Sequence, residues 1–494
     1  MSDAFYDVVI IGTELSGLIA GALLAKKGYR VLVVGHGQRS NRYVHEGFSF
    51  QRRPWLFSGF ETSAPVKRVF SDLGLSLEMH NRPKPFDPFY QIVLPGRRID
   101  VAAKEALFER ELRREFGGEV ERIQGFYRAV REQNERIARV LEHNAIMPPD
   151  GFFESRAYRK LMEEALNPPI TDPLATLGPR HPFLPFVLAP LAFSSGCQLE
   201  PYSPVQLTRL ATHLGRGLFH IEGGIDTLKS IFIERVKQNC GDYRDAIQID
   251  RFAMRRGKVR EVVIRDRREV IGCEAVICNM DIKRFFNLIP EEDQKERYHL
   301  GIHELQPTHY LYTTNFAVRG EAVPEGMGRH VFHVPDPSRA LEDDNLLLIQ
   351  VDAAERTPAE GDTHVLSVTA RIRARHVRPT LEWVEAVDAR LVRQLATVVP
   401  FVHEHLVAQG SAWVTLDKRT RTHVVDPTVF VPILGSPLED TLDITPIGCR
   451  TAYKNVLVAG DHLMSGLGFE GAFLGALNVL QLTSDLVSKK SLIG

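Results

Sequence analysis

The first forty residues carry the feature that most constrains the fold. Val8 to Ile11 is a short β-branched run, typical of a strand buried on both faces of a parallel sheet. Small and apolar residues follow at helical spacing from Leu18 to Lys27, Gly28 ends that helix, and Val31 to Val34 forms a second apolar strand. Strand, glycine turn, helix and strand make one βαβ unit. The sequence therefore predicts an α/β fold that opens with a Rossmann-like unit.

The turn between the first strand and the helix departs from the dinucleotide-binding pattern. That pattern needs one glycine for the tight turn, a second for the approach of the pyrophosphate, and a third for helix packing. Gly12 and Gly17 supply the first and third, but Glu14 stands at the middle position. A carboxylate adds bulk and negative charge where a helix N-terminus should attract a diphosphate. Gly35 also replaces the acidic residue that normally accepts the ribose hydroxyls.

Two interpretations of this turn stay open on these residues alone. In the first, FAD is held by other contacts, with Glu14 on the ribose and Arg39 or Arg42 on phosphate. In the second, a Rossmann-like scaffold has lost its cofactor, because a glycine pattern is only a hypothesis about binding.

The C-terminal segment has a second glycine-rich pattern. A short strand from Val456 to Ala459 leads into Gly460 and Asp461, and an apolar helix begins after Gly468. Asp461 would emerge at the carboxyl end of its strand, where ligands bind in open α/β sheets. The positive end of the following helix would face the same place.

Together these segments resemble the FAD-dependent phytoene desaturase and carotenoid isomerase-like oxidoreductases of the flavin amine oxidase superfamily. The order and spacing of the matching segments are more specific than any one of them. These segments are Tyr6 to Gly12, Gly28 to Val33, Gly47 to Phe50, Tyr202 to Leu228, Ala275 to Asp281 and Ala459 to Asp461.

The resemblance implies a Rossmann-like two-dinucleotide-binding-domain FAD fold with non-covalently bound FAD. It assigns the Asp461 carboxylate to the ribityl chain, the start of the last helix to the flavin, and the backbone of Ile249 to adenine. The candidate cofactor-binding residues are Gly12, Glu14, Leu15, Ser16, Gly17, Arg39, Arg42, Ile249, Gly460, Asp461, Gly468, Gly471 and Ala472. The family has no universal catalytic side chain, so the catalytic residue is left unassigned, and no metal is expected.

The implied function is two-electron exchange between FAD and a lipophilic isoprenoid or polyene substrate, by desaturation, saturation or isomerisation. One alternative is a cofactor-free binding or escort protein on the same fold, which the departures at Glu14 and Gly35 favour. Another is a flavin amine oxidase, which would need an aromatic cage beside the flavin. A lipophilic substrate also implies peripheral contact with a membrane.

The 494 residues are too many for one core, and the cofactor motifs lie at both ends of the chain. We therefore expect a discontinuous FAD domain from residues 1–85, 216–300 and 440–494, with a substrate-binding domain inserted from 86–215 and 301–439. The formal net charge of −1 does not favour nucleic acid as a partner. Five scattered cysteines and no basic leader segment predict a cytoplasmic protein, at most peripheral to the inner face of a membrane.

Two further segments yield structural predictions. The apolar stretch from His181 to Leu199 contains Pro182, Pro185 and Pro190, which would break a membrane-spanning helix there, so the segment is interpreted as core or as an apolar entrance to a pocket. His213 and His220, which flank an expected substrate wall, are each interpreted as a buried, hydrogen-bonded structural histidine rather than a catalytic one.

Overall fold

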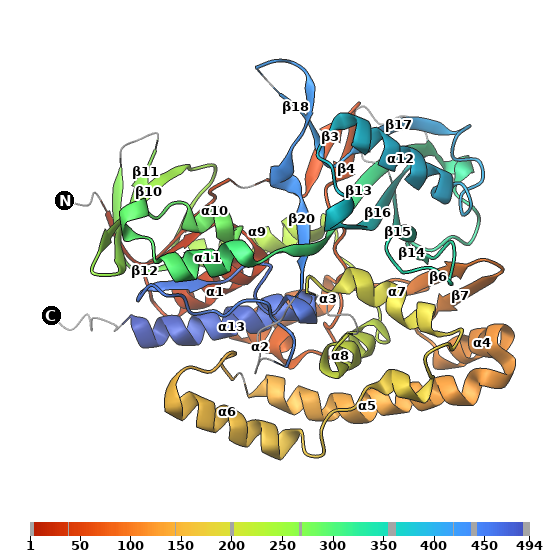
Figure 1. The fold of residues 1–494 in the computed structure, drawn as a ribbon, viewed down its shortest axis with the longest axis horizontal. Helices are drawn as coiled ribbons and strands as arrows, with labels where there is room; N and C mark the ends of the chain where they lie inside the picture. Colours follow the sequence, from red (N-terminus) through yellow and green to blue (C-terminus); the bar gives the residue numbers. More distant parts are fainter. Residues whose placement is uncertain are drawn as a thin grey trace.

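The computed structural model describes residues 4–37, 39–143, 145–197, 202–265, 269–353, 362–417, 419–435 and 442–487. It is an α/β structure with two large sheets, each covered by helices (Figure 1). In the view of Figure 1 the first sheet lies at the left, the second at the upper right, and helices α5 and α6 run along the bottom.

The first sheet contains the βαβ unit expected from the sequence. Five parallel strands lie in the order β9-β2-β1-β12-β21, and an antiparallel pair, β10 and β11, extends β12. The strands are β1 (Ala4–Ile11), β2 (Val31–Val34), β9 (Asp242–Arg244), β10 (Ile249–Arg255), β11 (Lys258–Ile264), β12 (Val270–Cys278) and β21 (Val456–Val458).

Successive side chains of a strand point to opposite faces, so the continuous apolar runs of β1 and β2 place apolar side chains on both faces of this sheet. Other elements cover both faces. Val8 and Ile10 pack with helices on one face, while Val9 and Ile11 pack with the elements on the other. The helices on the first face are α1 (Leu15–Lys26), α2 (Ala64–Asp72), α3 (Ser76–Asn81), α9 (Gly224–Gln238) and α13 (Phe469–Leu486). Those on the second are α10 (Ile282–Phe286) and α11 (Glu296–Glu304).

The second sheet is mostly antiparallel. Its order is β17-β13-β16-β15-β14-β6-β7, with β20 paired to β13. The strands are β6 (Tyr90–Leu94), β7 (Arg97–Val101), β13 (Pro307–Arg319), β14 (His330–His333), β15 (Asp343–Ala353), β16 (Thr363–Arg373), β17 (Leu406–Ser411) and β20 (Val431–Leu434). Two-residue to four-residue strands form small pairs elsewhere: β3 (Arg42–His45) with β4 (Phe48–Gln51), β5 (Lys84–Pro85) with β8 (Phe219–His220), and β18 (Val414–Leu416) with β19 (His423–Val425).

Helices cover both faces of the second sheet as well. Helix α12 (Leu381–Leu395) shares one core with it. The other core is shared with α4 (Glu105–Phe116), α5 (Val120–Glu142), α7 (Leu184–Ser194) and α8 (Pro204–Leu214), and α6 (Gly151–Ala165) follows α5.

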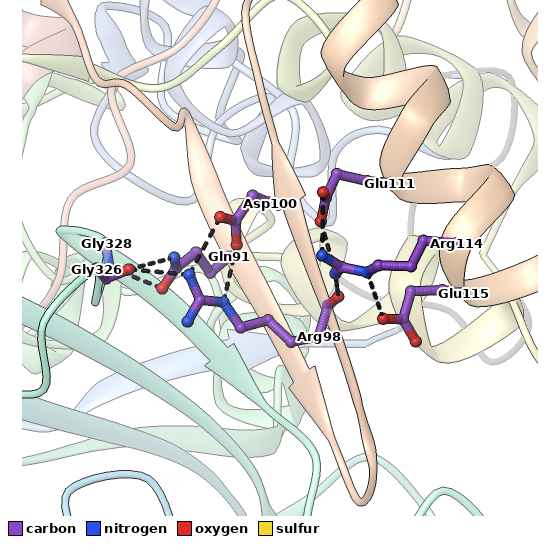
Figure 2. Close-up of polar contacts among 8 residues, drawn as sticks. All are labelled: Gln91, Arg98, Asp100, Glu111, Arg114, Glu115, Gly326 and Gly328. Atoms are coloured by element: carbon purple, nitrogen blue, oxygen red, sulfur yellow. Dashed lines mark hydrogen bonds and ion pairs between the residues drawn. The ribbon is translucent and has the colours of Figure 1, made fainter.

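A polar network joins α4 to the β6–β7 hairpin and to a neighbouring loop (Figure 2). The Arg114 guanidinium donates to the carbonyl of Arg98 at 2.7 Å and contacts Glu111 on its own helix. Arg98 in turn donates to Asp100 and to the carbonyl of Gly326. Backbone acceptors fix the geometry here, so the network sets the position of the helical layer on the sheet edge.

The expectation that the prolines break a helix in the apolar segment is wrong for Pro190, because α7 (Leu184–Ser194) continues through it. Pro185 lies in the first turn, where a missing N–H costs no helical hydrogen bond. Pro190 lies inside the helix, whose side chains are almost all buried in the core. Tertiary burial therefore outweighs the local cost of one proline. Residue 199 lies outside the described residues.

The strands of the first sheet come from residues 4–34, 242–278 and 456–458, and those of the second from 90–101 and 307–434. This distribution has the alternation expected of a discontinuous cofactor domain with an insertion. The domain limits themselves stay a prediction, and the one at 439/440 falls outside the described residues.

Candidate functional site

A cavity of about 490 Å³ opens at the carboxyl ends of β1, β12 and β21. This volume is within the range of small-molecule and cofactor sites. Its floor consists of the strand ends, the residues that lead into α1 and the first turn of α13, and its opposite wall includes residues 428–433, most of which belong to β20 or directly precede it. Ligands in open α/β sheets bind at this edge.

Glycines at two strand ends give the cavity its floor. Gly12 has φ +106° and Gly460 has φ +88°, conformations that side chains disfavour. A Cβ at Gly12 would overlap the backbone of Asn279, and one at Gly460 would overlap the Glu14 carboxyl group. At the start of α13, Gly468 (φ +58°) similarly has no room for a Cβ against the Ser194 carbonyl.

Glu14 crosses the cavity between two strand ends. It stands immediately before α1, and its Oε2 accepts a hydrogen bond from the backbone N–H of Asp461 at 2.5 Å. The position expected for a pyrophosphate is therefore taken by the side chain of Glu14. Glu14 therefore fills space that a cofactor would need, and it also uses the Asp461 N–H, a donor that a cofactor could otherwise bind.

Arg53 and Lys229 bring two positive charges to the same place. The Arg53 guanidinium donates to Asp461 Oδ2 and stacks on the Trp55 ring, 4.3 Å from its centroid. Lys229, on α9, lines the cavity beside Asp461 and Glu14. Two acids and two bases thus meet at the centre of the cavity.

The pKa values of the two acids move in opposite directions. Burial and the neighbouring Asp461 charge raise the pKa of Glu14 to about 8, so Glu14 is mostly protonated at neutral pH. Burial also disfavours ionisation of Asp461, but Arg53 and Lys229 outweigh it, and the pKa of Asp461 is lowered. Burial lowers the pKa of Lys229. The acid that would lie beside a phosphate is therefore the neutral one.

The far end of the cavity is lined by His36, which follows β2. The Ile249 N–H, which the family resemblance assigns to adenine, donates to His36 Nδ1 at 2.9 Å. Burial and the nearby Arg265 lower the pKa of His36, so its imidazole is neutral at pH 7. Arg39 also lines the cavity, but its guanidinium forms an ion pair with Asp426 at 2.6 Å.

The structure brings seven of the thirteen candidate residues to the cavity surface. These are Gly12, Glu14, Arg39, Gly460, Asp461, Gly468 and Ala472. The other six do not line it: Leu15, Ser16, Gly17, Arg42, Ile249 and Gly471. Leu15, Ser16 and Gly17 are buried in the first turn of α1, Gly471 packs against the Met464 backbone, and Arg42 lines a smaller neighbouring cavity of about 70 Å³.

Sequence reasoning missed several charged or titratable side chains that line the cavity, among them Arg53, Lys229, His36 and His462. The Arg52-Arg53 pair before Pro54 was a usable signal, because it follows the Gly47–Phe50 segment that the resemblance includes. Lys229, five residues into a helix that begins at Gly224, had no such signal. Its role depends on where α9 packs.

Apart from the Glu14 side chain, the lining of the cavity suits a dinucleotide lying across the strand ends. Close approach to the strand ends is possible because the floor is glycine, and the α13 N-terminus and Asp461 face the cavity. For a dinucleotide to lie across the strand ends, the Glu14 side chain must move aside. Beyond the floor, apolar side chains including Leu56, Phe193 and Ile433 line the wall.

The described part of the chain contains neither a helix that could span a membrane nor a cluster of side chains suited to a metal ion. None of its helices is both long enough and apolar enough to cross a bilayer. None of its groups of His, Cys, Asp and Glu side chains is arranged to hold a metal ion.

Comparisons with known proteins agree with this architecture. Residues 10–73 match the family model of the NAD(P)-binding Rossmann-like domain. The chain is 22% identical over 505 aligned residues to a neurosporene-forming phytoene desaturase of Rhodobacter capsulatus, covering 94% of this chain and 89% of the desaturase.

Solved structures share the fold at low identity. An oxidoreductase of Methanosarcina mazei is 15% identical with a TM-score of 0.60, covering 96% of this chain and all of the other. A triple mutant of putrescine oxidase is 13% identical with a TM-score of 0.56, covering 98% of this chain and 99% of the oxidase. The chain therefore shares its fold with these two solved structures, contains a segment that matches the NAD(P)-binding Rossmann-like domain, and is similar to a phytoene desaturase over most of its length.

Proposed function

We propose that this protein is an FAD-dependent oxidoreductase acting on a lipophilic isoprenoid or polyene substrate. The observation that carries the proposal is one continuous cavity. It joins Gly460, Asp461 and the start of α13 to an apolar wall across the strand ends. Similarity to a phytoene desaturase over 94% of the chain supports the oxidoreductase class.

Bound FAD would supply two-electron exchange with a carbon–carbon or carbon–nitrogen bond. The chain's own residues bind and orient. The Asp461 carboxylate, whose pKa Arg53 and Lys229 lower, would accept hydrogen bonds from cofactor hydroxyls. The start of α13 lines the cavity at Gly468 and Phe469, so the positive end of the helix dipole would face a bound cofactor. The apolar wall formed by Leu56, Phe193 and Ile433 excludes water from an apolar ligand.

The test is a flavin titration followed by anaerobic reduction. Purified protein is titrated with FAD, and the flavin band is then followed as polyene substrates of increasing length are added. We expect saturable binding and bleaching by at least one polyene. Asp461→Asn should weaken FAD binding by about 10-fold or more, the loss of one charge-assisted hydrogen bond. Asp100→Asn, on the distant strand β7, is the matched control.

Failure to bind FAD at any concentration reached would contradict the proposal. Binding that is unaffected by Asp461→Asn would remove Asp461 from the site but leave the enzyme class standing. Bleaching by amines and not by polyenes would instead make the protein an amine oxidase.

A cofactor-free binding or escort protein is the second candidate. The contacts that favour it are those of Glu14 and Arg53, which satisfy the N–H and the carboxylate of Asp461 from within the chain. This candidate predicts that a fluorescent polyene binds with the same affinity whether or not FAD is added. The oxidoreductase predicts that FAD changes that affinity.

Peripheral membrane contact is part of the proposal, because a lipophilic substrate has to be transferred from a bilayer. Phe152 and Phe153 at the start of α6 are 71% and 84% exposed, and the exposed Arg156 and Lys160 follow on the same helix. Exposed aromatic and basic side chains on one helix suit an anionic lipid surface. Co-sedimentation with anionic vesicles should fall in the double variant Phe152→Ser/Phe153→Ser. Unchanged sedimentation would remove α6 as the contact.

A further inference from the structure

We propose that Glu14 is a latch across the dinucleotide cleft, and that FAD binds by displacing its side chain, so that this residue sets the protein's affinity for the cofactor. The inference rests on the proposed function and deepens it. It concerns which residue controls access of an anionic dinucleotide to the site.

The geometry of the latch is a direct bridge between the two glycine-bearing strand ends. Glu14 stands where β1 leads into α1, and its Oε2 receives the Asp461 N–H at the end of β21. The bridge fits closely, because even the Cβ of an alanine at Gly460 would overlap the carboxyl oxygen. A pyrophosphate lying across the same strand ends requires this volume.

The backbone groups of the turn that carries Glu14 are hydrogen-bonded to the side chain of Asn279. Asn279 donates through Nδ2 to the carbonyls of Gly12 and Glu14 at 3.2 and 2.9 Å, and its Oδ1 accepts from the Gly17 N–H at 3.0 Å. These bonds hold the turn rigid. Movement is therefore left to the Glu14 side chain, which the Asp461 N–H holds in place.

Charge makes the latch sensitive to pH. The groups facing Glu14 are Asp461 from β21, Lys229 from α9, Arg53 from the loop after β4, and the Cys278 thiol at the end of β12. A neutral Glu14 tolerates a diphosphate beside it, whereas an ionised one adds a third negative group. FAD binding should therefore weaken as the pH rises through 8.

The test compares four full-length proteins by flavin fluorescence titration at pH 6 and pH 9. They are wild type, Glu14→Gly, Glu14→Gln and the control Glu111→Gln, a mostly buried glutamate on the distant helix α4 (Figure 2). Circular dichroism establishes that each is folded. Glu14→Ala replaces Glu14→Gly if the added glycine unfolds the turn.

Removing the side chain should tighten FAD binding by ~10-fold or more at both pH values, because the competing group is gone. Glu14→Gln keeps the bulk but cannot ionise. It should therefore bind FAD like wild type at pH 6 and more tightly than wild type at pH 9. Glu111→Gln should match wild type throughout.

Each outcome separates the latch from the proposed function. FAD binding by wild type with no gain, or a loss, in Glu14→Gly overturns the latch and leaves the oxidoreductase standing. FAD binding by Glu14→Gly alone supports the latch and contradicts a wild-type flavoenzyme. If neither protein binds FAD, both proposals are overturned.

Discussion

Arg209 and Glu470 form a fully buried, two-pronged ion pair that joins α8 to the first turn of α13. Arg209 donates through Nε and Nη2 to the two carboxylate oxygens at 2.7 and 2.5 Å, and the two side chains are 1% and 0% exposed. His213 adds a bond to the same carboxylate at 3.0 Å. Burial disfavours the charge on Glu470, but Arg209 and His213 overcome it and hold its pKa well below the usual range. The start of α13, next to the cavity, is thereby fixed in place.

Breaking this pair should be strongly destabilising. Arg209→Met leaves the Glu470 carboxylate buried without its main partner, and we expect a loss of about 3–5 kcal/mol in the free energy of unfolding. The measurement is urea denaturation followed by circular dichroism. The double variant Arg209→Met/Glu470→Leu removes both charges and should recover much of that loss. A single variant that loses under about 1 kcal/mol would show that the pair does not hold α13.

Asn279 should be the most sensitive position at the α1 turn. Its side chain is completely buried and bonds the Gly17 N–H and the carbonyls of Gly12 and Glu14. Asn279→Ala should cost about 1–3 kcal/mol, the usual loss when buried backbone groups are left unpaired. Asn279→Asp keeps the acceptor for the Gly17 N–H but places a carboxylate oxygen against the carbonyls of Gly12 and Glu14, so its loss should be at least as large as that of alanine. Urea denaturation of both variants checks this, and a smaller loss for Asn279→Asp would mean that the two donated bonds contribute little.

Two glycines of α13 should respond differently to alanine. A Cβ at Gly471 would overlap the backbone carbonyl of Met464, whereas one at Gly475 would come within 3.2 Å of the movable Leu463 side chain. Gly471→Ala should therefore lose about 1–3 kcal/mol through overpacking. Gly475→Ala should change stability little, because the better helix propensity of alanine offsets the contact. Thermal unfolding of both variants checks this, and a reversed order would contradict the packing described for Gly471.

Stability should depend on pH through Glu14. The folded pKa of about 8 lies above the ordinary value of 4.5, so the folded state binds the proton more tightly than the unfolded state. This contribution to stability is complete below pH 4.5 and is lost as the pH rises to 8. The loss should be about 1–2 kcal/mol once solvent in the cavity is allowed for. Glu14→Gln should flatten the pH profile over this range in chemical denaturation, and a profile identical to that of wild type would contradict the raised pKa.

Much of the fold could be predicted from local patterns. The buried strand Val31–Val34 and the helix that ends before Gly28 are predicted by hydrophobic spacing and glycine position, and the structure has both. The interpretation of His213 as a buried, hydrogen-bonded side chain is confirmed by its 1% exposure and its bond to Glu470. The same interpretation of His220 is wrong, because β8 leaves this side chain exposed. The prediction from Pro190 was wrong for α7, because the positions of prolines in a sequence do not show how deeply the segment is buried.

The sequence by itself determined that this chain begins with a βαβ unit, ends with a strand, a Gly-Asp pair and a glycine-rich helix start, and lacks the middle glycine of the turn. Those features are local, since each depends on residues a few positions apart. Only the tertiary structure decided what Glu14 does, because its partner Asp461 is 447 residues away in the chain. The same holds for Lys229 and Arg53, whose charges reach the cavity through the packing of a helix and a loop. The raised pKa of Glu14 and the lowered pKa of Asp461 arise from burial and from charges brought together by folding, which no local pattern contains.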